Sequence, residues 1–140
     1  MSDDYDLQRF LAAQEPVYDD ALEILRHGMM CSPYVDFVFP RLAYATDTPN
    51  LFAISTLDEA RAYLAFPILG NRYRECIGAL AWLADETVHD VFDDVDARKL
   101  HASLTLFSEA SSEPVLRTML DLWFANLADE ATMLRIEQTI

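Results

Sequence analysis

Residues 56–66 read TLDEARAYLAF, and Pro67 follows them directly. Thr56 and Glu59 have the spacing of a capping box, in which two side chains satisfy the free backbone amides at a helix start. The residue before a proline avoids the helical conformation, so Pro67 marks the end of this predicted helix. The next stretch, 70–84, carries apolar residues at helical spacing, namely Tyr73, Cys76, Ile77, Leu80 and Leu83. The centre of the chain therefore predicts two consecutive helices.

The same periodicity recurs elsewhere in the chain. It predicts helices over 6–13, 16–28, 97–110, 114–127 and 129–138, with a short helical turn over 87–92. Only YVDFVF, residues 34–39, has the composition of a strand, and a single short strand has no partner with which to build a sheet. The sequence therefore predicts an all-α, single-domain multihelical bundle over residues 1–140, with about seven helices and one short extended segment.

The net charge of the chain limits the classes of partner that it can bind. The chain has 24 acidic residues against 10 basic ones, a formal net charge of -14, and Lys99 is its single lysine. A field of this sign repels phosphate backbones and anionic lipid, so we expect neither nucleic acid nor a membrane as a partner. The N-terminal MSDDYD lacks the features of a signal peptide, and the apolar runs are shorter than a bilayer span. We expect a soluble, cytoplasmic protein in which Cys31 and Cys76 are reduced thiols.

Common site motifs do not occur in the sequence. It contains no phosphate-binding glycine loop, no GxSxG and no metal-finger spacing. His89, close to Asp93 and Asp94, resembles a solvated acidic turn, so neither a metal nor a cofactor is predicted. Met29 and Met30 form an apolar patch suited to a pocket mouth or a subunit contact. A small-molecule ligand and a homodimer both remain open.

Asp36 is a single carboxylate within the apolar run SPYVDFVFPR, residues 32–41. If it is buried, it must be paired, protonated or in contact with water. One interpretation pairs Asp36 with Arg41, Arg72 or Lys99, or exposes it, within a non-catalytic binding or homo-oligomerisation module.

The other interpretation makes Asp36 a general base in an apolar pocket, because loss of water strengthens a carboxylate as a base. It would abstract a proton from a small organic molecule. The expected pocket wall consists of Tyr34, Phe37, Phe66 and Trp82. Developing negative charge would be stabilised by Arg41, Ser32 or Ser103.

A third hypothesis joins Cys31 to a histidine in a nucleophilic hydrolase, because a thiol needs a nearby base to become a thiolate. His101 and His27 are the candidate bases. Trp82 and Trp123 each lie on an apolar helical stripe, which favours core packing for both indoles.

The order of these segments resembles the bacterial domain-of-unknown-function family eighteen-ten, whose members are often mislabelled calpastatin. The resemblance covers nearly the whole chain. Its most specific part is DEARAYLA, residues 58–65, followed by Pro67, Leu69, Gly70, Arg72, Glu75 and Cys76. The resemblance implies a mostly helical single domain and no established biochemical activity.

One segment departs from the family pattern. Members usually read Lys-x-Ser-His-Trp-Met-Trp-Phe-[Ile/Val]-Phe-Pro-Gln after the second helix, a cluster that looks like a pocket lining. Here Ser32 is kept, whereas the replacements are Met30 for lysine, Pro33 for histidine, Tyr34 and Asp36 for the tryptophans, Val35 for methionine and Arg41 for glutamine. Phe66 stands where another histidine is usual. The departure leaves two histories open: a diverged natural member that has lost the ancestral function, or a pocket remodelled around new groups such as Asp36, by nature or by engineering.

Overall fold

The computed structural model describes residues 5–29, 34–43, 51–83 and 86–139. Its helices are α1 (Gln8–Gln14), α2 (Tyr18–Arg26), α3 (Val35–Val38), α4 (Leu57–Ala65), α5 (Pro67–Ala81), α6 (Val88–Val91), α7 (Asp94–Ala110), α8 (Pro114–Phe124) and α9 (Glu130–Thr139). Across these ranges there is no strand, only an isolated parallel bridge between Leu42 and Ile54. The predicted all-α class is confirmed. None of the helices in the described part of the chain has the length and apolarity that crossing a membrane requires.

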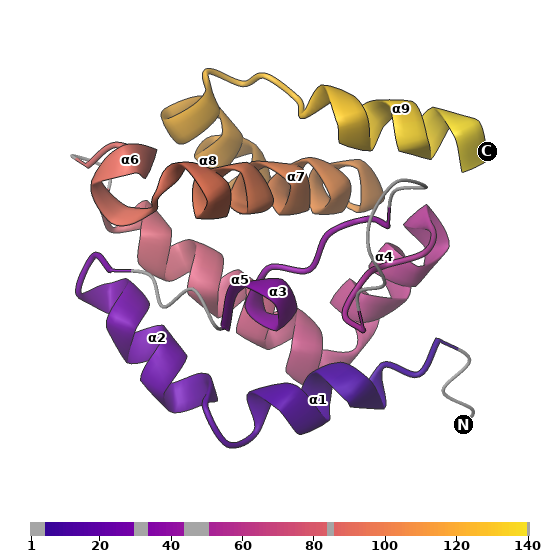
Figure 1. Ribbon diagram of the computed structural model, residues 1–140, viewed down its shortest axis with the longest axis horizontal. Helices are drawn as coiled ribbons and strands as arrows, with labels where there is room; N and C mark the ends of the chain where they lie inside the picture. The colour runs from indigo at the N-terminus through magenta and orange to yellow at the C-terminus, as the bar shows by residue number, and fades with distance from the viewer. Residues whose placement is uncertain (1–4, 30–33, 44–50, 84–85, 140) are drawn as a thin grey trace.

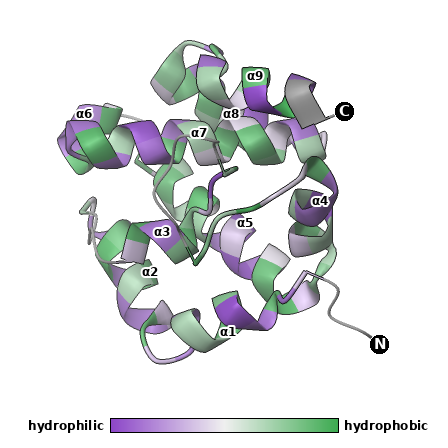
Figure 2. Ribbon diagram, turned by 45° about the vertical axis from the view of Figure 1, so that its right-hand side comes forward, coloured by the Kyte–Doolittle hydropathy of each residue, from purple (hydrophilic) through white to green (hydrophobic). Residues whose placement is uncertain are grey.

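Helix α7 lies at the centre of the fold. It packs against α3, α4, α6, α8 and α9, while α5 packs against α2, α4 and α8 (Figure 1). The middle of α7, residues 102–108, is buried on every side, as expected for a helix enclosed by others. Outer helices such as α1 and α2 instead carry hydrophilic and hydrophobic residues side by side (Figure 2).

An aromatic cluster joins four helices in the core. Tyr63 from α4 and Tyr73 from α5 pack on Phe107 of α7, with ring centroids 5.3 and 4.5 Å away, and Phe10 of α1 meets Tyr63 edge-on at 5.0 Å. Both buried hydroxyls have partners: Tyr73 shares a 3.0 Å hydrogen bond with Ser103, and the Gln14 amide donates to the Tyr63 hydroxyl. The core is therefore tied together by polar contacts as well as by packing.

Pro67 does end α4, but the next helix begins earlier than the predicted residue 70. Helix α5 starts at Pro67 itself, because the ring suits the first helical position, where the missing N–H is not needed. Trp82 is also not a core residue: its exposed fraction is 91%. Two positions beyond the buried Leu80, it points about 200° away around the helix, so the predicted stripe does not include it. The core position predicted for Trp123 is confirmed.

Residues 34–39 do not form the extended piece that their composition suggests. Val35 to Val38 form one turn of helix, α3. Val35, Val38 and Phe39 are buried, at the i, i+3 and i+4 spacing of one helical face. The turn therefore leaves Asp36 and Phe37 partly buried at the edge of the core. The extended backbone comes just after it, where Ile54 N donates to the carbonyl of Arg41.

Candidate functional site

Three charged side chains meet where α3 contacts α7. Lys99 Nζ lies 3.2 Å from Asp36 Oδ1, and Arg41 Nη2 lies 3.8 Å from the same oxygen. This oxygen is shielded from solvent and accepts no well-aligned hydrogen bond from the described residues, so both contacts are ionic. The Asp36 side chain as a whole is 41% exposed, whereas Lys99 and Arg41 are 24% and 22% exposed. We call these three residues the α3 site.

The fold fixes each member of the α3 site independently. Asp36 projects from a helical turn whose other face is in the core, and Lys99 projects from the central helix. Arg41 is held because its carbonyl and the amide of Ala43 both bond to Ile54, at 2.8 Å. The three charges therefore meet on backbone that core packing and two hydrogen bonds hold in place.

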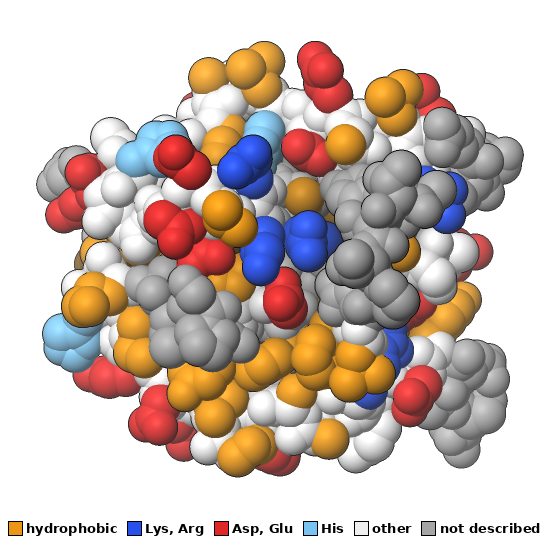
Figure 3. Space-filling view, in the orientation of Figure 1, with side chains coloured by type: hydrophobic (Ala, Val, Ile, Leu, Met, Phe, Trp, Pro, Cys, Tyr) orange, Lys and Arg blue, Asp and Glu red, His pale blue; other side chains and the backbone are white. Residues whose placement is uncertain are grey.

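Half-buried aromatic rings flank Phe37, the residue that follows Asp36 in the chain. The Phe37 ring lies 6.0 Å from Tyr34 and 5.3 Å from Phe52, measured between centroids, and each of these rings is partly exposed. In Figure 3, Lys and Arg side chains gather at the middle of the face on which α3 lies, with hydrophobic side chains below them. The site thus combines cationic groups with an aromatic surface.

The remaining residues of the predicted Asp36 pocket lie elsewhere. Phe66 is partly buried at the junction of α4 and α5, and Trp82 lies on the surface beside Arg26 and Glu75. Ser103 is fully buried and bonded to Tyr73. Of the expected wall, Tyr34 and Phe37 lie close to Asp36 in the chain, and Phe52, which the sequence pattern did not indicate, packs on Phe37.

Cys31 and Ser32 lie outside the described residues. Of the candidate bases, His27 is exposed beside Glu23, while His101 stacks on Phe124 with ring centroids 4.2 Å apart. Cys76 is a buried free thiol. Burial raises the pKa of Cys76 to about 12, the opposite of what a nucleophilic thiolate needs.

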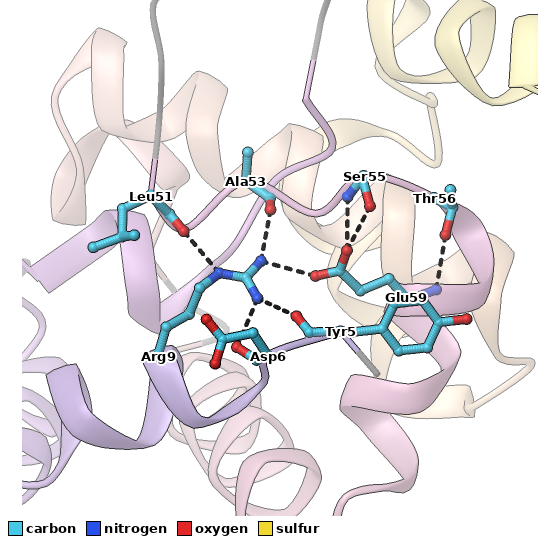
Figure 4. Close-up of polar contacts among 8 residues, drawn as sticks. All are labelled: Tyr5, Asp6, Arg9, Leu51, Ala53, Ser55, Thr56 and Glu59. Carbon is cyan, nitrogen blue, oxygen red and sulfur yellow. Dashed lines mark hydrogen bonds and ion pairs between the residues drawn. The ribbon is translucent and has the colours of Figure 1, made fainter. Parts of the chain in front are cut away.

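A second polar cluster surrounds Arg9 and is shown in Figure 4. All five guanidinium N–H groups donate: they bind the carbonyls of Tyr5, Asp6, Leu51 and Ala53 and one oxygen of Glu59. The other Glu59 oxygen accepts from the amide and hydroxyl of Ser55. Since every donor is used, this cluster has a structural role and no capacity for a ligand.

A separate cavity of about 610 Å³ opens between α6, α7 and α8. Its floor includes Ala97 and Trp123, and Arg98 and His101 also line it. The sequence pattern did not reveal this cavity, although its lining residues come from three consecutive helices, because the pattern shows the apolar face of each helix and not the angle at which the helices pack.

These observations describe a small helical protein with an ionic site above an aromatic core. The family model for a protein of unknown function, DUF1810, matches residues 4–136, so the chain belongs to that family. The crystal structure of the conserved hypothetical protein Rv1873 from Mycobacterium tuberculosis is similar, with a TM-score of 0.92 and 33% sequence identity over 96% of this chain and 99% of that chain. A comparison with curated proteins gives no match. The expected family and fold are thus confirmed, and neither match states an activity.

Proposed function

We propose that this protein is a non-catalytic binding module whose α3 site takes a small organic anion. The observation that carries the proposal is the approach of Lys99 and Arg41 to a single oxygen of Asp36. Two cations against one carboxylate leave a local surplus of one positive charge. On a chain with a net charge of -14, such a local surplus favours the binding of an anionic ligand at the α3 site.

The same geometry argues against Asp36 as a general base. A carboxylate becomes a strong base where it has lost water and has no neighbouring cation. Asp36 retains 41% exposure and has two cationic neighbours. This supports the role of a counter-charge that holds Lys99 and Arg41 together until a ligand arrives.

The adjoining rings define the rest of the ligand. A carboxylate or phosphate would bond to Lys99 and Arg41, as charge-assisted hydrogen bonds are the stronger ones. Its apolar part would then lie on Phe37, the residue after Asp36, and on Phe52, which packs on Phe37; both rings remain partly exposed. We expect a compact anion with a ring or short apolar chain.

Titration calorimetry with phenyl phosphate tests this function. Asp36→Asn removes the competing carboxylate, so the affinity should rise about threefold, in line with the energy of exposed charge pairs. Lys99→Gln should lower the affinity about tenfold, because it removes a charged hydrogen-bond donor. Asp58→Asn is the matched control, since it deletes one exposed negative charge on α4 and should leave binding unchanged.

The two interpretations of Asp36 predict different results for Asp36→Asn. If Asp36 is a counter-charge, the variant binds phenyl phosphate more tightly. If Asp36 is a general base, the variant loses any turnover of a bound molecule. Weaker binding of phenyl phosphate to Asp36→Asn, or unaltered binding to Lys99→Gln, would overturn the proposed function.

A further inference from the structure

The cavity between α6, α7 and α8 has the form of a ligand site that is separate from the α3 site. Its volume of about 610 Å³ lies within the usual range for pockets that hold small organic molecules. Trp123 and Ala97 line it and are buried, whereas Arg98 and His89 line it and are exposed. An apolar floor with a polar rim suits a ligand that is flat at one end and charged at the other.

Arg98 supplies the charge. Its Nε donates to the backbone carbonyl of Asp94 at 3.3 Å, and no carboxylate in the described part of the chain lies within ion-pair distance of its guanidinium. The carboxylate of Asp94, on the same rim, is instead 3.3 Å from His89 Nδ1. In so acidic a protein, an arginine without a carboxylate partner in a cavity favours an anion that approaches from outside.

The aromatic groups supply a flat wall. The rings of His101 and Phe124 stack at 4.2 Å with an interplanar angle of 4°. Trp123 uses its indole N–H in a 3.1 Å bond to the carbonyl of Glu86, so only its ring is available to a ligand. A planar aromatic molecule matches such a surface better than an aliphatic one.

His101 indicates one polar group that the ligand should carry. Its Nε2 lies 2.7 Å from the carbonyl oxygen of Leu127, which can only accept, so Nε2 carries the hydrogen. In the neutral ring Nδ1 is then an acceptor, and no contact of the described residues uses it. A ligand with an O–H or N–H group on its ring would satisfy this nitrogen.

From these observations we propose that the α6–α8 cavity binds a planar aromatic carboxylate with a hydrogen-bond donor on the ring. The carboxylate bonds to Arg98, the ring lies against Trp123 and Phe124, and the donor reaches His101 Nδ1. This site does not depend on the proposed function of Lys99 and Arg41, which bind a different anion.

Titration calorimetry with 6-hydroxy-2-naphthoate tests the charge preference, with 6-hydroxy-2-naphthamide as the neutral comparison. The carboxylate should bind about fivefold more tightly than the amide, the scale of one partly exposed charge pair. Arg98→Gln should abolish this difference. Arg61→Gln, which removes an exposed arginine on α4, should retain it, and Lys99→Gln should retain it as well.

The position of the ligand can be read from one resonance. The chain has two tryptophans, and Trp82 is 91% exposed, so Trp82→Phe leaves Trp123 as the single indole without disturbing the core. The indole N–H resonance of Trp123 should shift on addition of 6-hydroxy-2-naphthoate. Equal affinities for acid and amide, an unshifted resonance, or the same loss in Arg61→Gln as in Arg98→Gln would each overturn the proposal.

Discussion

Arg9 Nη2 lies 2.8 Å from Glu59 Oε2, although fifty positions separate the two residues in the chain. Their side chains are 14% and 4% exposed, so the pair is largely removed from water. Arg9 belongs to α1 and Glu59 to the first turn of α4 (Figure 4). The pair therefore fixes the first helix against the central part of the fold.

Glu59→Gln should destabilise the protein through this contact. The substitution keeps the size of the side chain but leaves the Arg9 guanidinium without its counter-charge in a buried place. We expect the free energy of unfolding to fall by about 3 kcal/mol, as for other buried ion pairs that lose one member. Urea unfolding followed by circular dichroism measures the change.

Asp58→Asn is the neighbouring control. Asp58 pairs with Arg61, but both side chains are more than half exposed. The free energy of unfolding should change by less than about 0.5 kcal/mol. Equal losses of unfolding free energy in Glu59→Gln and Asp58→Asn would show that burial does not strengthen the Arg9–Glu59 pair.

The two glycines of α5 should respond to alanine in opposite directions. A Cβ at Gly70 would lie 2.1 Å from the carbonyl oxygen of Leu64, which belongs to the backbone and has no room to move. A Cβ at Gly78 would meet nothing within 4 Å. Gly70→Ala should therefore cost more than about 2 kcal/mol of stability, and Gly78→Ala should add up to about 1 kcal/mol through helix propensity.

Thermal unfolding of the two variants checks this difference. Both changes add one methyl group to the same helix, so each serves as the control for the other. A Gly70→Ala protein as stable as Gly78→Ala would show that α4 and α5 do not approach as closely at their junction as the structure indicates.

Local signals in the sequence predicted most of the helices. Thr56 accepts a hydrogen bond from the amide of Glu59, so the predicted start of α4 is confirmed. The Glu59 carboxylate, however, bonds to Ser55 and Arg9 rather than to the amide of Thr56. Spacing identifies the helix start, whereas the distant partner depends on tertiary structure.

The α3 site was harder to predict from the sequence than the start of α4, because it depends on tertiary contacts. Residues 34–39 have the composition of a strand, but packing of Val35, Val38 and Phe39 against the core produces a helical turn. Arg41 and Lys99 were among the predicted partners of Asp36, and both contacts are present. Phe52 has no periodic signal because its ring neighbours, Phe10 and Phe37, lie far from it in the chain. The α6–α8 cavity has none because it depends on how three consecutive helices pack.

Cys76 should be unreactive toward thiol reagents while the protein is folded. Its thiol is buried, and burial raises its pKa from 9.0 to about 12. The chain has two cysteines, so Cys31→Ser leaves Cys76 as the single thiol. We expect Ellman's reagent to label this variant at pH 8 only after urea has unfolded it. Rapid labelling without denaturant would contradict the burial of Cys76.

The raised pKa of Cys76 also predicts a loss of stability at alkaline pH. The folded-state pKa of about 12 exceeds the ordinary value of 9.0, so the unfolded chain releases this proton first. The stability contribution is therefore fully present below pH 9 and declines as the pH rises toward 12. Burial likewise raises the pKa of Tyr63 and Tyr73, which adds to the decline above the ordinary tyrosine range.

Urea unfolding at a series of pH values from 7 to 11 measures this dependence. The thiol alone should contribute a slope of about 1.4 kcal/mol per pH unit above its ordinary pKa, because one proton is released on unfolding. Cys76→Ala removes that proton, so its stability should fall less steeply over the same interval even though its stability at pH 7 is lower. Parallel pH profiles for the two proteins would mean that the Cys76 thiol ionises equally readily in the folded and unfolded chains.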